Sequence, residues 1–125
     1  MSAGDNGRII LVVHQPGNAK VLGQAVSEIG MTAVTAASGS ELEARLAEPD
    51  PARAALVDVS GFGSQVWPLC SLLHDHDIPF VVMSPARDQE ASTRSVQYGA
   101  STVLQKPIAK EALLNLLKSL SGRAV

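Results

Sequence analysis

Residues 9–13 read Ile-Ile-Leu-Val-Val, a run of apolar side chains without polar alternation. A short and continuously apolar run is typical of a strand buried on both faces, as in a parallel sheet covered by helices. A helical stripe with the spacing i, i+3, i+4, i+7 follows, formed by Leu22, Ala25, Val26 and Ile29. Gly30 then stands where a helix ends in the left-handed conformation. This opening predicts a strand, a helix and a return to the sheet.

The same alternation continues to the end of the chain. Further strands are predicted at 31–36, 54–57, 80–83 and 102–104. A helix is predicted to begin at Ser40, where Ser40 and Glu43 have the spacing of a capping box, and to end before Pro49. The other helices are predicted around the stripe Val66, Leu69, Cys70 and Leu73, over 88–98 before Gly99, and around Leu113, Leu116, Leu117 and Leu120. Apolar strands that alternate with helices imply an α/β fold with a parallel five-stranded sheet covered on both sides.

Composition narrows the class of protein. The chain has 125 residues, a net charge of −2 and four aromatic residues among Phe, Tyr and Trp. With no basic stripe and few aromatics, we expect no nucleic-acid binding. A single cysteine excludes an internal disulfide, and no apolar run is long enough for a signal peptide or a membrane span. We therefore expect one cytoplasmic domain at 8–121, with a disordered segment at 1–7 and a tail at 122–125.

Polar residues stand where the predicted strands end. They are His14 and Gln15, Asp58, Ser84, and Lys106 before Pro107. Each also has an ordinary structural explanation: Asp58 could cap the following loop, and Lys106 could be a solvent-exposed lysine without a role. Because ligands bind outside the carboxyl ends of the strands in open α/β sheets, their shared location favours a functional site.

The sequence resembles the receiver domain of two-component response regulators over about residues 8–120. The resemblance rests on five stretches: 10–13, the Ala-Leu-Val-Asp at 55–58, the Ile-Pro-Phe-Val-Val-Met-Ser at 78–84, the Tyr-Gly-Ala-Ser at 98–101, and Lys106-Pro107. It implies a flavodoxin-like fold with strand order 2-1-3-4-5. It also implies that Asp58 accepts a phosphoryl group from a histidine kinase, that Lys106 contacts the phosphoryl oxygens, and that Ser84 hydrogen-bonds them in the active state. The Lys106–Pro107 peptide is expected to be cis, as is typical of that family.

The sequence departs from the family where Mg²⁺ is held. The family places two acidic residues after the first strand, and here they are His14 and Gln15. Asp58, the Gln15 amide oxygen and the Ser60 carbonyl make a poor oxygen set for octahedral Mg²⁺, so we expect weak Mg²⁺ binding or none. The aromatic switch position of the fifth strand is Val103, which removes gating by an aromatic rotamer.

Two readings of this departure remain open. In the first, Asp58 is phosphorylated by an atypical route, with His14 partly replacing the charge of the metal. The only chemistry of the chain would then be transfer of a phosphoryl group from phosphohistidine to Asp58. In the second, the chain is a pseudo-receiver that binds partners without phosphorylation. Either form acts by protein–protein contact, and the fourth helix, fifth strand and fifth helix form the expected partner or homodimer surface.

Other motifs support weaker alternatives. Gly61-Phe62-Gly63 lies between a strand and a helix, as in a dinucleotide-binding loop, but Val66 occupies the third glycine position. A small flavodoxin-like module that binds nucleotide or phosphate is therefore the alternative of a different class. The His-Asp-His-Asp at 74–77 is expected on the rim opposite Asp58, as a solvated loop. Cys70 is expected in the core, and Trp67, which lies off the apolar stripe, is a candidate for an exposed partner contact.

Overall fold

The computed structural model describes residues 7–49, 52–84, 89–105 and 108–122, and five parallel strands form one sheet in the order β2-β1-β3-β4-β5. The strands are β1 (Arg8–Val12), β2 (Thr32–Ala36), β3 (Ala54–Asp58), β4 (Phe80–Ser84) and β5 (Thr102–Gln105). The helices are α1 (Pro16–Glu28), α2 (Gly39–Leu46), α3 (Val66–Asp75) after the short 3₁₀ helix η1 (Gly63–Gln65), α4 (Gln89–Gln97) and α5 (Lys110–Gly122). The predicted fold class and strand order are confirmed, and the segments 1–6 and 123–125 lie outside the described residues.

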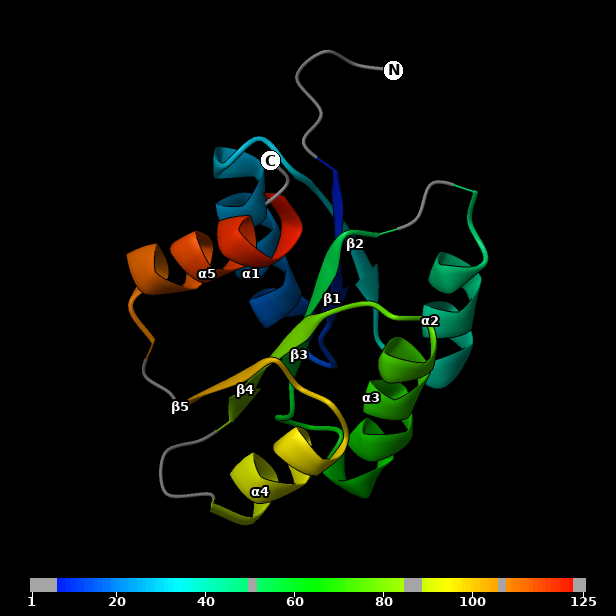
Figure 1. The fold of residues 1–125 in the computed structure, drawn as a ribbon. Helices are drawn as coiled ribbons and strands as arrows, with labels where there is room; N and C mark the ends of the chain where they lie inside the picture. The colour runs from blue at the N-terminus through cyan, green and yellow to red at the C-terminus, as the bar shows by residue number, and fades with distance from the viewer. Residues whose placement is uncertain (1–6, 50–51, 85–88, 106–107, 123–125) are drawn as a thin grey trace.

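Helices cover both faces of the sheet (Figure 1). Alternate strand residues point to opposite faces, so Ile10 and Val12 join one core cluster and Ile9 and Leu11 join the other. The first cluster packs under α2 and α3, and the second packs under α1 and α5. This two-sided burial explains why the central strands are apolar without alternation.

The edges and the centre of the sheet differ in burial. Every residue of β3 and β4 is buried, whereas β2 and β5 at the two edges carry half-buried and exposed side chains. The carboxyl ends of all five parallel strands meet at one edge of the sheet. That edge is where Asp58 ends β3 and Ser84 ends β4.

Local signals place most helix ends as predicted. Gly30 adopts φ +79° after α1, Gly99 adopts φ +100° after α4, and Pro68 lies in the first turn of α3. The predicted capping box at Ser40 and Glu43 is wrong. Ser38 caps α2 by accepting from the Glu41 N–H at 3.2 Å, and Glu41 accepts from the Ala37 N–H.

The sequence contains two overlapping candidates for the capping box of α2. Ser38 and Glu41 have the same S-x-x-E spacing as Ser40 and Glu43, so spacing alone cannot separate them. The earlier box is used because β2 ends at Ala36 and leaves only a short connection to the helix. Leu42 then becomes the fully buried residue of α2.

Candidate functional site

Asp58 lies at the carboxyl end of β3, and its carboxylate is held by hydrogen-bond donors. The residue is 1% exposed. The backbone N–H of Ser60 donates to Oδ1 at 3.0 Å, and Asn18 Nδ2 lies 3.5 Å from Oδ2. A buried carboxylate needs such donors to compensate for lost hydration. The Ser60 contact is also the loop-capping role that an isolated Asp commonly has, so this contact alone does not distinguish structure from function.

Asn18 is a member of the site that the sequence prediction missed. It stands in the first turn of α1, and its Nδ2 lies 3.1 Å from Gln15 Oε1 as well as near Asp58. Gln15, Asn18 and Asp58 therefore form a chain of hydrogen bonds from the β1–α1 connection to the end of β3. A sequence signal was available, because a polar residue in the first turn of the helix after β1 faces the carboxyl edge of the sheet.

Ser84 lies at the same edge on the neighbouring strand. The register pairs Asp58 with Met83 and Ser84 with Gln105. Ser84 is fully buried, and its Oγ has no hydrogen-bond partner among the residues that the structure describes. Since side chains alternate along a strand, Ser84 belongs to the face of Val82 and Asp58 to the face of Leu56. The two residues flank the sheet edge from opposite faces.

His14 does not contribute to the Asp58 contacts. Its ring is exposed and packs edge-on against Phe62, with ring centroids 5.5 Å apart. Within the part of the chain that the structure describes, no hydrogen bond or ion pair joins the side chains of His14 and Asp58. A Cβ on Gly61 would lie 2.8 Å from His14 Cδ2, so the glycine permits this close approach. The expectation that His14 supplies charge beside Asp58 is not supported by this arrangement, because its ring is engaged by the β3–η1 loop.

The lysine of the predicted site lies outside the described residues. Gln105 ends β5 beside Ser84, and Lys106 and Pro107 follow it in the sequence. The predicted role of Lys106 and the predicted cis peptide therefore stay predictions. Val103 is half-buried and packs against the cluster under α2 and α3, so this switch position holds an aliphatic side chain.

The residues at this edge do not fit a Mg²⁺ site. Magnesium prefers octahedral oxygen ligation that includes carboxylates. Across 7–49, 52–84, 89–105 and 108–122, no three His, Cys, Asp or Glu side chains gather as ligands. Near Asp58, the Asn18 contact is an N–H donor, so the amide as placed turns its NH₂ and not its oxygen to the carboxylate.

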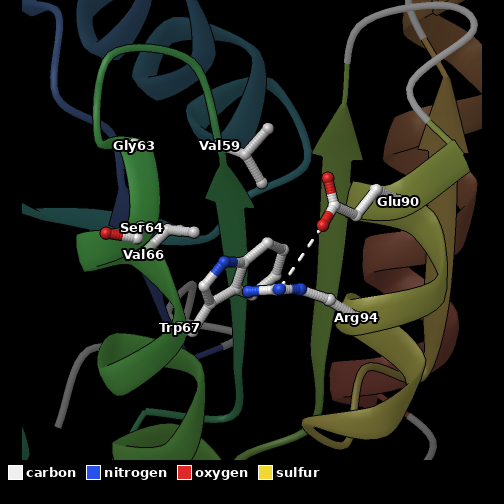
Figure 2. A pocket seen from close by; sticks show the side chains of 7 residues that line it. All are labelled: Val59, Gly63, Ser64, Val66, Trp67, Glu90 and Arg94. Atoms are coloured by element: carbon white, nitrogen blue, oxygen red, sulfur yellow. Dashed lines mark ion pairs between the residues drawn. The ribbon is translucent and has the colours of Figure 1, made fainter.

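A pocket of about 290 Å³ lies between α3 and α4 on the other face of the same edge (Figure 2). It is lined by Val59, Gly63, Ser64, Val66, Trp67, Glu90 and Arg94. Trp67 and Arg94 reach into it from α3 and α4, and Glu90 pairs with Arg94 at 3.3 Å. Trp67 is half-buried and stacks on Tyr98, with ring centroids 5.7 Å apart. The expectation of an exposed Trp67 is wrong, because Tyr98 at the end of α4 covers one side of its ring.

The remaining motifs lie away from Asp58. The residues at 74–77 are all exposed and lie at the end of α3, on the opposite rim. The ring of His76 contacts the Leu72 carbonyl at 2.9 Å through Nδ1. Cys70 is fully buried in the core, as predicted, and burial raises the pKa of its thiol to about 12. No helix in the described part of the chain combines the length and apolarity that a membrane span requires.

Comparison with known proteins shows the fold. No family model matches the sequence, and no curated protein matches it. Among solved structures, a candidate response regulator from Chloroflexus aurantiacus J-10-fl has a TM-score of 0.82 and 23% identity, covering 94% of this chain and 98% of that one. A response regulator receiver protein from Burkholderia phymatum has a TM-score of 0.80 and 20% identity, covering 95% and 98%.

A third similar structure is a CheY-like response regulator receiver domain protein from Methanospirillum hungatei JF-1. Its TM-score is 0.78 at 22% identity, with 90% of this chain and 91% of that chain covered. The chain thus has the fold of response regulator receiver domains over nearly its whole length. This confirms the fold implied by the resemblance that the sequence showed.

Proposed function

We propose that this chain acts as a receiver domain in two-component signalling, accepting a phosphoryl group on Asp58 and signalling by protein–protein contact. The proposal is supported by the receiver-like fold and by the sequence stretches that resemble that family. A histidine kinase is the expected donor. In the transfer, a carboxylate oxygen of Asp58 bonds to phosphorus as the phosphorus–nitrogen bond of phosphohistidine breaks, and the imidazole takes up a proton.

The arrangement of Asp58 is the observation that carries this proposal. The carboxylate stands at the carboxyl edge of the sheet, where open α/β folds bind ligands. Its Oδ1 is engaged by the Ser60 N–H at 3.0 Å, and its Oδ2 has the longer contact of 3.5 Å with Asn18. Either carboxylate oxygen at this edge could act as the nucleophile toward phosphorus.

Ser84 supplies the response to phosphorylation in this proposal. Its buried hydroxyl lacks a partner among the described residues, and an unsatisfied hydroxyl gains free energy when it finds an acceptor. A phosphoryl group on Asp58 would offer oxygens across the sheet edge, and the Ser84 side chain would turn toward them. Lys106 would neutralise charge on the same group.

The partner surface is proposed on α4, β5 and α5. Val96 on α4 is 63% exposed and offers an apolar contact on this surface. Movement of Ser84 at the end of β4 would pass to α4, the helix that follows it. A signalling partner or a second copy of the chain would read this change in the position of α4.

A direct test is phosphorylation of the purified protein with a small-molecule donor. We expect incubation with phosphoramidate, whose phosphorus–nitrogen bond resembles phosphohistidine, to add the mass of one phosphoryl group in intact-mass spectrometry. Asp58→Asn, which keeps the size of the side chain, should take up none. Asp75→Asn is the matched control, because Asp75 is exposed on the opposite rim and its loss should leave the uptake unchanged.

The alternatives predict other results. If the wild-type protein takes up no phosphoryl group from phosphoramidate or from a kinase, the pseudo-receiver interpretation holds. A module that binds nucleotide or phosphate through the loop at 61–63 would instead show a rise in melting temperature with nucleotides. A melting temperature that no nucleotide changes would reject that alternative.

A further inference from the structure

We infer that Asn18 takes the place of a divalent cation at Asp58, so that phosphoryl transfer to Asp58 proceeds without Mg²⁺. This inference rests on the proposed phosphorylation of Asp58. It assigns to the side-chain amide of Asn18 two successive tasks. One N–H donates to the Asp58 carboxylate before the transfer, and the same N–H passes to an oxygen of the phosphoryl group as that group arrives, while the other N–H stays on Gln15 Oε1. It also assigns Gln15 the task of orienting Asn18.

The hydrogen bonds of Asn18 determine which way its amide faces. Both of its contacts are oxygen atoms, Gln15 Oε1 at 3.1 Å and Asp58 Oδ2 at 3.5 Å. Only the NH₂ end of an amide can donate to two acceptors, because the other end is itself an acceptor. The Asn18 NH₂ group therefore points toward Oδ2 of Asp58.

The position of Asn18 is determined by the backbone around it. Pro16 begins α1, and the chain turns into the first helical turn with Gln15 in an extended conformation. Pro is favoured at this position because its fixed φ suits a helix start. The first turn of a helix leaves backbone N–H groups without intrahelical partners, and these favour negative charge nearby. Asn18 stands in this turn of α1.

The electrostatics favour donors over a metal here. The NH₂ group of Asn18 faces the carboxylate, and the described residues gather no group of three or more His, Cys, Asp or Glu side chains around it. The charge that develops on phosphoryl oxygens during transfer can be stabilised by preorganised N–H donors, as in an oxyanion hole. The Asn18 amide and the Ser60 N–H supply two such donors on either side of the carboxylate.

His14 makes a different contact. Its ring packs edge-on against Phe62 in the loop after β3, with ring centroids 5.5 Å apart. Asn18 remains as the side chain from the β1–α1 region that contacts the carboxylate.

The experiment measures the rate of phosphorylation by phosphoramidate with EDTA and with Mg²⁺, using intact mass. We expect the wild-type rate to be the same in both. Asn18→Ala should lower it about a hundredfold, the lower end of the loss expected for one oxyanion donor. Gln24→Ala, on the exposed surface of α1 and away from the proposed partner surface, is the matched control and should match the wild type.

Asn18→Asp gives the readout that a merely structural role would not change. This variant places a second carboxylate beside Asp58, which should slow the reaction in EDTA and create a requirement for Mg²⁺. Far-ultraviolet circular dichroism of each variant would verify folding. A metal-independent wild type with a slow Asn18→Ala and a Mg²⁺-dependent Asn18→Asp supports the inference.

Other results would overturn it. A wild-type protein that needs Mg²⁺ contradicts the inference and leaves the proposed function intact. An Asn18→Ala variant as fast as the wild type, or an Asn18→Asp variant that ignores Mg²⁺, also contradicts it. No uptake by the wild type under either condition rejects the proposed function and this inference together.

Discussion

Replacing Ser84 with alanine should raise the free energy of unfolding and weaken the structural response to phosphorylation of Asp58. Ser84 is fully buried, and its Oγ has no partner among the described residues. A buried hydroxyl without a hydrogen bond costs about 1–3 kcal/mol of folding free energy. Ser84→Ala removes that cost and leaves a cavity the size of one oxygen atom, worth a few tenths of a kcal/mol at about 24 cal/mol per Å³.

The net expectation is a gain of about 1 kcal/mol in the free energy of unfolding, taking the low end of the cost of an unsatisfied hydroxyl. For a domain of this size that corresponds to a rise of roughly 4 °C in melting temperature. Thermal and urea unfolding followed by circular dichroism would measure both values. Because the hydroxyl is proposed to bind the phosphoryl group, the variant should also lose the shift in α4 contacts that follows phosphorylation.

Ser95 provides the control for this measurement. It is as deeply buried as Ser84, and it does have an interaction partner. Ser95→Ala should therefore show no gain in stability. A Ser84→Ala variant that is less stable than the wild type by about 1 kcal/mol, the worth of a typical hydrogen bond, would refute the reasoning, since the hydroxyl would then be satisfied in the folded protein.

The other predictions concern packing around the site and in the core. Gly61→Ala should cost about 2 kcal/mol of stability, because φ is +86° there and the new Cβ meets the ring of His14. Unfolding measurements should show a smaller cost for Gly61→Ala when it is made together with His14→Ala, which removes that ring. Cys70 should resist alkylation in the folded protein. Burial raises the pKa of its thiol from 9.0 to about 12, so between these pH values the thiol loses its proton in the unfolded chain but keeps it in the folded one. The free energy of unfolding should therefore fall as pH rises from about 9 toward 12. Iodoacetamide labelling that is as fast in native buffer as in urea would contradict this. Tyr98→Leu should lower stability by about 1 kcal/mol, because it removes the ring stacked on Trp67. It should also shift the fluorescence emission of Trp67, the only tryptophan of the chain. An emission spectrum identical to that of the wild type would contradict this prediction.

Local patterns in the sequence were sufficient for the architecture. The apolar run at 9–13, the stripe ending at Gly30 and the later repeats of the same pattern predicted the strands and α-helices that the structure describes, but not the short helix η1. These signals are local because the geometry of each helix or strand determines which of its own residues face the core, and so which positions must be apolar. Asp58 and Ser84 were also placed correctly at one edge, since parallel strands must bring their carboxyl ends together.

Side-chain contacts between distant elements were decided only by the tertiary structure. Asn18 contacts Asp58 across forty positions of sequence, and Trp67 is covered by Tyr98 from another helix. His14 turns to Phe62 because the loop after β3 passes close to it at Gly61. Periodicity reports which face of an element is buried, but it carries no information on which distant side chain meets it. The sequence by itself therefore determined the sheet and the edge at which Asp58 and Ser84 stand, and the packing of separate elements decided which polar groups surround the carboxylate.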